Sequence, residues 1–407
     1  MKGTGNGEIT ITAEPHQGLG RRTATFNVVP NGVKNSQIDI FQGDNQNANE
    51  DNEFPILAWT GIDVKFPPMK EAGFNLYLQW YDNLNEVLKA LNDAYAGGIK
   101  LITSCPELKN NTEATVNSLM NHPALYGYHL DDEPEVSEFQ SLSRWTAQIQ
   151  AIDSKHPCYI NLYPNWAWGG ADKYAANVAA FLEQVPVPFL SFDYYPIVQI
   201  NGAPSILRPD WYRNLEDISA AAKAKKIPFW AFVLALSHTL DASHFYPVPT
   251  LAELRLQVFS NLAYGAQGIQ YFTYWGIYQS GPTQVYDRVK TVNQEIRNLS
   301  SVFLHANVIS VWHTGNQLPN GTRPINQLPS PIKSLITSDG GAVVSFLEKG
   351  NDQYLAVVNR DYRNPMSLTV SFDVSVKKVE KSGSIIEANS GTIQVEAGDM
   401  IIYTWKK

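Results

Sequence analysis

The stretch Leu125-Tyr-Gly-Tyr-His-Leu-Asp-Asp-Glu-Pro134 is the best single predictor of this protein's fold. It begins as an apolar and aromatic run, typical of a buried strand, and it ends in three consecutive carboxylates, Asp131, Asp132 and Glu133. Pro134 cannot donate to a strand ladder, so the strand should end here. Three adjacent carboxylates repel one another, unless their pKa values are separated for acid–base chemistry or a cation lies among them. A solvated acidic loop is the alternative interpretation.

Seven further apolar runs of similar length accompany this strand, and segments of helical period lie between them. The eight predicted strands are 56–59, 74–80, 99–104, 125–130, 159–163, 189–192, 229–235 and 268–274, and the main predicted helices are 83–96, 135–152, 173–184, 211–224 and 251–264. Alternating strands and helices favour parallel pairing with right-handed crossovers. Eight such units over about 250 residues predict an α/β fold of the (β/α)8 TIM barrel type.

An open, doubly wound sheet is the competing fold. We rank it lower because Trp59-Thr-Gly-Ile-Asp63 follows the first strand with a single glycine, where such folds carry a glycine-rich phosphate loop.

The chain changes character on both sides of the predicted barrel. Short alternating strands at 334–337, 342–347, 354–359, 367–372, 392–396 and 400–405 predict a C-terminal antiparallel β-sandwich. We therefore expect an N-terminal lead-in at 1–53, a barrel at 54–305, a linker at 306–333 and a β-sandwich at 334–407. The lead-in contains two candidate strands, 8–13 and 23–29, and pairing with the C-terminal domain is one option for them.

Composition limits the possible partners. The 407 residues carry 31 basic and 39 acidic side chains, a net charge of −8, and no basic stretch, which argues against nucleic acid or an anionic membrane surface as a partner. No run of about eighteen apolar residues predicts a membrane span. The first residues lack the apolar segment of a signal peptide, and we expect a mature N-terminus behind an added Met, in a secreted or periplasmic protein.

Cys105 and Cys158 fall at the end of one predicted strand and the start of another. This placement argues against a disulfide and excludes a metal site built from cysteines. No cofactor is expected. A Ca²⁺ ion at the acid cluster is possible but not needed. Nothing in the sequence fixes the oligomeric state.

The C-terminal ends of barrel strands carry the chemistry in this fold. Besides the acidic triplet they present Asp193 and many of the chain's aromatic side chains, and aromatic rings can stack on the apolar faces of sugars. Glycosidic cleavage needs one carboxylic acid to protonate the leaving oxygen and a second carboxylate as nucleophile or base. We therefore predict a glycoside hydrolase that cleaves an O-glycosidic bond in an oligo- or polysaccharide. The predicted substrate-binding residues are Asp131, Trp59, Trp80, Tyr163, Trp166, Trp168, Tyr194, Tyr195, His238 and Trp275.

Three motifs carry a family resemblance: 122–134, Ser191-Phe-Asp-Tyr-Tyr-Pro196 and 253–275. Together they resemble clan A, the β-galactosidase-like glycoside hydrolases with a (β/α)8 barrel and a small C-terminal β-sandwich, and secreted polysaccharide-degrading enzymes of gut bacteria. The resemblance covers residue 54 to the C-terminus. In clan A an Asn-Glu pair ends the fourth strand. The resemblance therefore implies Glu133 as general acid/base, with Asp132 at the position that contacts the sugar 2-hydroxyl.

One departure from the clan concerns the nucleophile, a glutamate at the end of the seventh strand. The corresponding stretch 229–238 contains no acid. Asp193 on the sixth strand is the predicted substitute, either as nucleophile or as base for a water. Because the fourth and sixth strands are not adjacent, we expect a spacing nearer the ~6.5–9.5 Å of inverting enzymes than the ~5 Å of retaining ones, and we favour inversion. A carbohydrate-binding barrel without hydrolysis is the alternative, and a lyase with Tyr194 or Tyr195 as base is a third option.

Several of these residues have a structural interpretation as well. Asp193 could cap the turn that follows it, and Asp131 could hold His129 or an arginine. His238 could be an ordinary satisfied polar group, and Trp59, Trp80 and Trp230 are as consistent with the core as with a sugar site. Arg255 could reach a rim carboxylate or lie on a solvated helix face.

Overall fold

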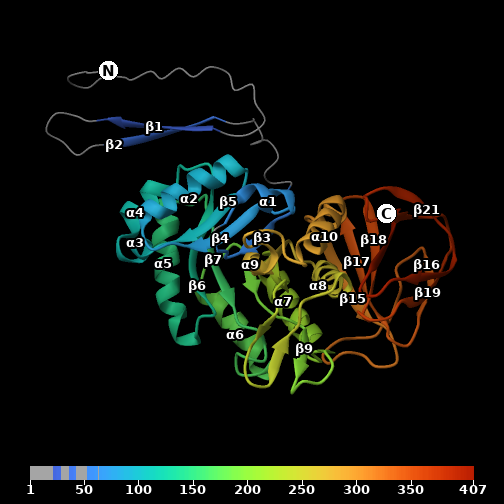
Figure 1. The fold of residues 1–407 in the computed structure, drawn as a ribbon. Coiled ribbons are helices and arrows are strands. Elements are labelled where there is room, and N and C mark those ends of the chain that lie inside the picture. The colour runs from blue at the N-terminus through green and yellow to red at the C-terminus, as the bar shows by residue number, and fades with distance from the viewer. Residues whose placement is uncertain (1–21, 29–35, 43–52, 63) are drawn as a thin grey trace.

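The computed structural model describes residues 22–28, 36–42, 53–62 and 64–407 (Figure 1). The predicted strand 8–13 and Asp63 lie outside these residues. The predicted strand 23–29 is confirmed as β1 (Arg22–Val28), which pairs antiparallel with β2 (Ser36–Gln42). The sheet that β1 and β2 form contains no strand of the C-terminal domain, so the suggested pairing between the two is wrong for the described residues.

Eight parallel strands close into a barrel in the order β11-β14-β3-β4-β5-β6-β7-β8. All eight predicted strands are confirmed. They are β3 (Ile56–Trp59), β4 (Leu76–Trp80), β5 (Lys100–Ser104), β6 (Leu125–Asp132), β7 (Cys158–Leu162), β8 (Leu190–Phe192), β11 (Phe229–Leu234) and β14 (Gly268–Phe272). Large side chains such as Leu57, Leu78, Ile102, Tyr159 and Phe232 form one cluster, which fills the barrel as a packed core.

Helices cover the outside of the barrel. They are α1 (Phe66–Glu71), α2 (Leu84–Gly97), α3 (Pro106–Asn110), α4 (Thr112–Leu119), η3 (Val136–Glu138), α5 (Phe139–Ile152), α6 (Ala171–Gln184), α7 (Trp211–Lys225), α8 (Leu251–Ala263), α9 (Tyr274–Ile277), α10 (Tyr286–Asn298) and α11 (Ser300–Phe303). Local capping fixes where some of them begin. The Asn83 side chain accepts from the Glu86 backbone, and Thr250 and Glu253 form a reciprocal capping box.

A small antiparallel sheet, here called the rim sheet, grows from the loops after β8 and β11. Its strands are β9 (Ile197–Ile200), β10 (Ile206–Leu207), β12 (His238–Thr239) and β13 (His244–Tyr246), in the order β10-β9-β13-β12. In Figure 1 it lies near β9 at the lower edge of the molecule. Val198 and Tyr246 are buried against Leu234 and Leu236 at the end of β11, so one face of this sheet packs on the barrel rim.

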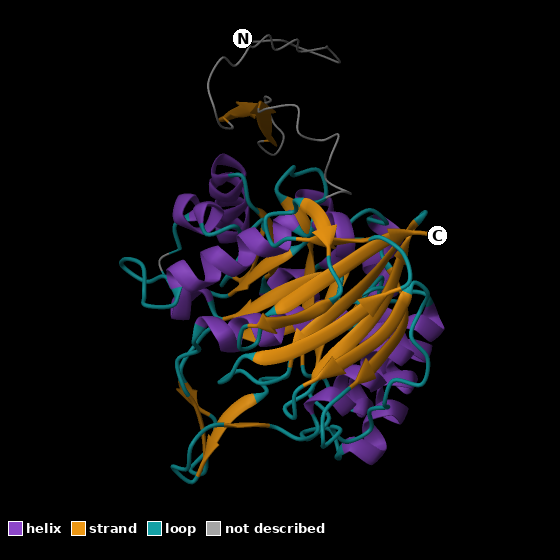
Figure 2. Cartoon of the chain, turned by 90° about the vertical axis from the view of Figure 1, so that its right-hand side faces the viewer, coloured by secondary structure: helices purple, strands orange, loops and turns teal. Residues whose placement is uncertain are grey.

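The C-terminal region is an antiparallel β-sandwich, as predicted (Figure 2). One sheet has the order β15-β17-β18-β23-β20-β21 and the other β16-β19-β22. The strands are β15 (Asn307–His313), β16 (Ile332–Thr337), β17 (Ala342–Lys349), β18 (Asp352–Asn359), β19 (Met366–Phe372), β20 (Val376–Val379), β21 (Ile385–Ala388), β22 (Gly391–Val395) and β23 (Met400–Lys406). Part of the predicted linker 306–333 is therefore a strand, β15, because its Val311 and Trp312 are buried against the neighbouring strands.

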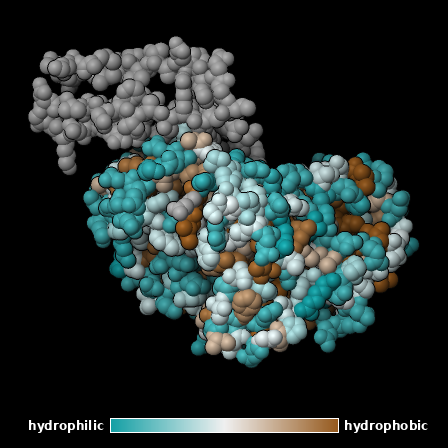
Figure 3. All heavy atoms as spheres, viewed as in Figure 1, coloured by the Kyte–Doolittle hydropathy of each residue, from teal (hydrophilic) through white to brown (hydrophobic). Residues whose placement is uncertain are grey.

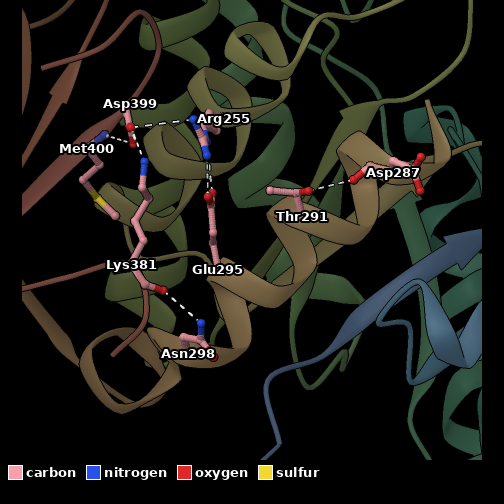
Figure 4. A network of polar contacts seen from close by, with 8 residues as sticks. All are labelled: Arg255, Asp287, Thr291, Glu295, Asn298, Lys381, Asp399 and Met400. Atoms are coloured by element: carbon pink, nitrogen blue, oxygen red, sulfur yellow. Dashed lines mark hydrogen bonds and ion pairs between the residues drawn. The ribbon is translucent and has the colours of Figure 1, made fainter. Parts of the chain in front are cut away.

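An ionic network joins the barrel to the sandwich (Figure 4). Arg255 of α8 pairs with Glu295 of α10 at 2.5 Å and lies 3.7 Å from Asp399 at the start of β23. Lys381 also contacts Asp399. Both sequence-based interpretations of Arg255 are therefore wrong: it reaches neither a rim carboxylate nor open solvent, because a second domain covers this helix face.

The surface seen in Figure 3 is largely hydrophilic, with apolar side chains in small separate patches. Among the described residues, no helix has both the length and the apolar character needed to cross a membrane. Cys105 and Cys158 are buried free thiols, so the expected absence of a disulfide is confirmed.

Candidate active site

A bulge in β6 sets the direction of the acidic triplet. In the pairing with β7, His129 lies opposite Tyr159, but the next pairs are Asp131 with Ile160 and Asp132 with Asn161, so Leu130 has no partner. Paired residues of parallel strands point to the same face, and an extra residue reverses the alternation that follows it. Asp132 therefore shares the inward face with Asn161, where an unbulged strand would have turned it outward.

Glu133 follows with a left-handed backbone, at φ 58°, which is uncommon for any residue other than glycine. Its backbone N–H donates to the Asn161 carbonyl at 2.9 Å, which extends the hydrogen bonding with β7 by one residue. The Glu133 carboxyl group shares a hydrogen bond with the carboxyl group of Asp193, which follows β8. The expectation that these two acids stand well apart is wrong, because their side chains reach each other at the end of the intervening strand β7.

Two hydrogen-bonded carboxyl groups must share a proton, since a pair of carboxylates has no donor. Burial, the nearby Asp132 charge and the Asp193 contact together set the pKa of Glu133 at about 7. Burial and the adjacent Glu133 and Asp132 hold the pKa of Asp193 well above its usual range. Partial burial also raises the pKa of Asp132, although this residue is exposed to solvent and Asn161 opposes the shift.

A buried polar network inside the barrel orients these acids. The Asn161 amide donates to Asp132 at 3.1 Å and to Asp193 at 3.4 Å, and its oxygen accepts from Ser191 at 2.8 Å. Because both amide groups have matched partners, the side chain cannot rotate by half a turn without placing its oxygen against the carboxyl groups. Gln270 donates to Ser191 at 2.9 Å and accepts from Tyr159 at 2.6 Å.

Sequence reasoning missed this network of Asn161, Ser191, Gln270 and Tyr159. The available signal was a polar residue inside an otherwise apolar strand, at 161, 191 and 270. Such a residue in a barrel interior must find a hydrogen-bond partner and is therefore more informative than the apolar residues around it.

Trp80, His129 and Trp59 form an aromatic group next to the acids. Trp80 is 46% exposed and stacks on His129, with the ring centroids 5.9 Å apart. His129 is buried, its Nε2 atom has no hydrogen-bond partner among the described residues, and burial lowers its pKa to about 4. Trp59 is only 3% exposed, which matches its structural interpretation as a core residue.

Tyr163, Trp166 and Trp168 follow β7. Trp166 is 39% exposed, which leaves part of its ring free to stack on a sugar. Trp168 is also a predicted substrate-binding residue, but it is only 4% exposed, because it packs between Phe139, Tyr163 and Tyr174. Tyr163 is partly buried, and its raised pKa, which comes mainly from burial, also reflects the charge of Glu133.

The predicted residues around the rim sheet divide into two groups. Tyr194 is buried and donates to Asp210 at 2.6 Å, which is a structural position. Tyr195, His238 and Trp275 are partly buried at the rim. Tyr195 is close enough to the acid cluster that the charges of Asp193, Asp132 and Glu133 add to the effect of burial in raising its pKa. His238 packs edge-on to Tyr195, with centroids 6.1 Å apart.

Asp131 supports the turn. Its Oδ1 atom accepts from the Asp132 backbone at 2.9 Å. Asp193 bonds to Glu133 and Asn161 through its side chain, which differs from the turn-capping alternative. The described part of the chain contains no group of three or more His, Cys, Asp or Glu side chains arranged to hold a metal ion.

The fold is similar to that of several solved structures. One is a β-galactosidase from Bacillus circulans sp. alkalophilus, which has a TM-score of 0.59 and 10% identity over 87% of this chain and 99% of that one. The resemblance is one of fold.

Two other solved structures match with lower scores. A β-galactosidase from the psychrophilic Marinomonas ef1 has a TM-score of 0.44 and 8% identity, and the match covers 61% of this chain and 60% of that one. An α-L-arabinofuranosidase from Thermotoga maritima has a TM-score of 0.42 and 10% identity over 84% and 89%. No family model matches the sequence, and no curated protein matches it.

Proposed function

We propose that this protein is an O-glycosyl hydrolase that acts on an oligo- or polysaccharide, with Glu133 as the general acid and Asp193 as the second carboxylate. The observation that carries this proposal is the hydrogen-bonded pair of carboxyl groups at the C-terminal ends of β6 and β8. In most glycosidases a pair of acids flanks the bond that is cleaved. The barrel fold, shared with solved glycosidases, agrees with this chemistry.

One shared proton matches the needs of the reaction. The first step requires one acid protonated and the other ionised. The two pKa values place the shared proton on Asp193 in the free protein, so it must pass to Glu133 when substrate binds. Glu133 then gives this proton to the glycosidic oxygen, the bond from that oxygen to the anomeric carbon breaks, and the sugar leaving group departs as an alcohol. The Asp193 carboxylate then bonds to the anomeric carbon. Water, deprotonated by Glu133, later releases the sugar and restores both acids.

This scheme is a retaining mechanism, and it replaces the inversion favoured by strand order. An inverting pair needs a gap of ~6.5–9.5 Å that admits a water molecule. Hydrogen-bonded carboxyl groups are much closer than that, and a substrate has to separate them by a smaller movement to reach the ~5 Å of a retaining pair.

The test is turnover of a panel of aryl glycosides and polysaccharides by the wild type and by Glu133→Gln. We expect release of sugar by the wild type, and loss of about 10²-fold or more in the variant wherever the leaving group needs a proton. Following the released anomer by NMR should show net retention. Net inversion would overturn the role of Asp193 as nucleophile.

A second candidate is a barrel that binds carbohydrate without cleaving it. The observation in its favour is the seventh barrel strand, β11, which has no carboxylate at its end. Binding of a glycan by both proteins with no product from either would favour this candidate over the hydrolase.

A further inference from the structure

Arg208 occupies an unusual position beside the candidate active site. It lies between β10 and α7, and its backbone N–H donates to the Pro196 carbonyl at 2.7 Å, which fixes this part of the chain against the segment that follows Asp193. Its side chain is partly buried.

The guanidinium group of Arg208 lies between two aromatic rings. Its central carbon is 5.0 Å from the centroid of Trp166 and 6.0 Å from that of Tyr246, and Nη2 donates to the Tyr246 hydroxyl at 3.1 Å. At these distances the cation–π attraction between the guanidinium group and the rings is significant. These contacts restrict the orientation of the planar guanidinium group.

Arg208 also has no carboxylate at contact distance among the described residues, whereas Arg213, Arg255 and Arg297 each have one. Its Nε group is buried with no hydrogen-bond partner in the described part of the chain. The nearby Asp210 accepts from Tyr194 instead. A guanidinium group has five N–H donors, and a neutral phenol oxygen satisfies only one of them.

The path from Arg208 to the acids is short and consists of packed rings. Tyr246 stacks on His238, with centroids 4.7 Å apart, and both lie edge-on to Tyr195 at 5.9 and 6.1 Å. Tyr195 in turn lies within the electrostatic range of Asp193, Asp132 and Glu133. Two successive aromatic rings, Tyr246 and Tyr195, therefore separate Arg208 from the carboxyl cluster, and Arg208 itself lies over the exposed Trp166.

We propose that Arg208 and Trp166 form a subsite for an anionic sugar unit, one that carries a carboxylate or a sulfate ester. The planar fork of an arginine fits two oxygens of either group, and the exposed surface of the Trp166 ring can support the apolar face of the sugar. The local positive charge also offsets the repulsion that an anionic substrate meets from the acid cluster and from a net charge of −8. This subsite refines the proposed function and rests on it for the identity of the reaction.

Binding can be measured without turnover, in a Glu133→Gln background. The ligands are an oligogalacturonate, a sulfated galacto-oligosaccharide and a neutral galacto-oligosaccharide of equal length, titrated by calorimetry. We expect at least one anionic ligand to bind more tightly than the neutral one, and Arg208→Gln to weaken that binding about tenfold or more without changing neutral binding. If Arg208→Gln weakens only the oligogalacturonate, the subsite binds a carboxylate. If it weakens only the sulfated ligand, the subsite binds a sulfate ester.

Three further variants test the assignment. Arg208→Lys keeps the charge but loses the fork, and it should recover only part of the affinity. Trp166→Ala should weaken anionic and neutral ligands alike. Arg144→Gln removes one exposed positive charge from α5 and serves as the matched control, with no expected effect. Circular dichroism confirms that each variant is folded.

The proposal fails if neutral ligands bind as well as both anionic ones, or if Arg208→Gln weakens all three equally. That result is independent of catalysis. Anionic binding that depends on Arg208, in a protein without hydrolytic activity, would support the subsite and reject the hydrolase. Hydrolysis without any Arg208-dependent anionic binding would support the hydrolase and reject the subsite.

Discussion

Glu133 combines two uncommon properties: a left-handed backbone at φ 58° and a carboxyl group with a pKa of about 7. The first costs of order 1 kcal/mol in a residue other than glycine. The second means that folding encloses a group that prefers to be charged in water at neutral pH. Both are expected where a side chain is held in place for chemistry at the expense of stability.

Activity should therefore rise as the pH approaches neutrality. The reaction needs one acid protonated and the other ionised, and the pair reaches that state when its first proton leaves with a pKa of about 7, because the pKa of Asp193 lies well above its usual range. We expect kcat/KM to fall about tenfold for each pH unit below about 7. Initial rates on an active aryl glycoside between pH 5 and 9 give this profile, and a rate that stays level down to pH 5 would contradict a proton shared by these two acids.

Stability supplies a control that does not depend on turnover. The folded pKa of Glu133 lies above its ordinary value of 4.5, so its stabilising contribution is complete below that value and is lost as the pH rises through about 7. Glu133→Gln removes this dependence. The variant should gain in unfolding free energy relative to the wild type between pH 4.5 and 7, as followed by urea denaturation at several pH values.

At the scale of the element, β6 positions the site through its irregular pairing with β7. Gly127 packs closely against the residue before β7, because an added Cβ there would be 2.5 Å from the Pro157 carbonyl oxygen. Glycine at this position lets β6 and β7 pair closely from Tyr128 up to the bulge at Leu130.

Gly127→Ala should force β6 and β7 apart. Overpacking against a backbone atom, which cannot rotate away, costs about 1–3 kcal/mol. We expect a decrease of that size in the free energy of unfolding, with a loss of activity from the displaced carboxyl pair. Gly281→Ala is the matched control, because no heavy atom lies within 4 Å of its added Cβ. Equal unfolding free energies for the two variants would contradict this account of β6.

The sequence was informative about elements and much less so about their irregularities. The barrel strands are apolar runs bounded by turn residues, and this local pattern located all eight. The bulge at Leu130 has no such pattern, so the sequence did not show that Asp132 shares the inward face with Asn161. The rim-sheet strands were missed because they have only two to four residues, too few for a period to appear.

Burial of individual aromatic residues was equally hard to predict. Trp166 and Trp168 are two positions apart beside the same glycines, yet one is exposed and the other lies between Phe139 and Tyr174. The difference arises from α5 and α6, which pack over this loop. Arg255 shows the same limit, since its partners Glu295 and Asp399 are 40 and 144 positions away in the chain.

At the scale of the whole molecule, the sandwich acts as a support for the barrel. Arg255, Glu295 and Asp399 have side chains that are 17%, 9% and 8% exposed, so the network of Figure 4 is largely removed from water. Buried charges of this kind depend on their partners, because a charge left alone keeps its full desolvation cost.

Arg255→Gln should destabilise the protein by about 3 kcal/mol, because Glu295 would lose its cation in a buried setting and Asp399 would keep only Lys381. Urea denaturation at pH 7 measures the change. Lys89→Gln is the matched control: it breaks a pair with Asp93 in which both side chains are more than half exposed, and its unfolding free energy should stay within error of the wild type. If the two variants lose equal stability, the sandwich is not held to the barrel by this network. If Arg255→Gln alone unfolds in two steps as the urea concentration rises, a first step that leaves the tryptophan fluorescence of the barrel unchanged would show that the lost stability belongs to the interface between the two domains.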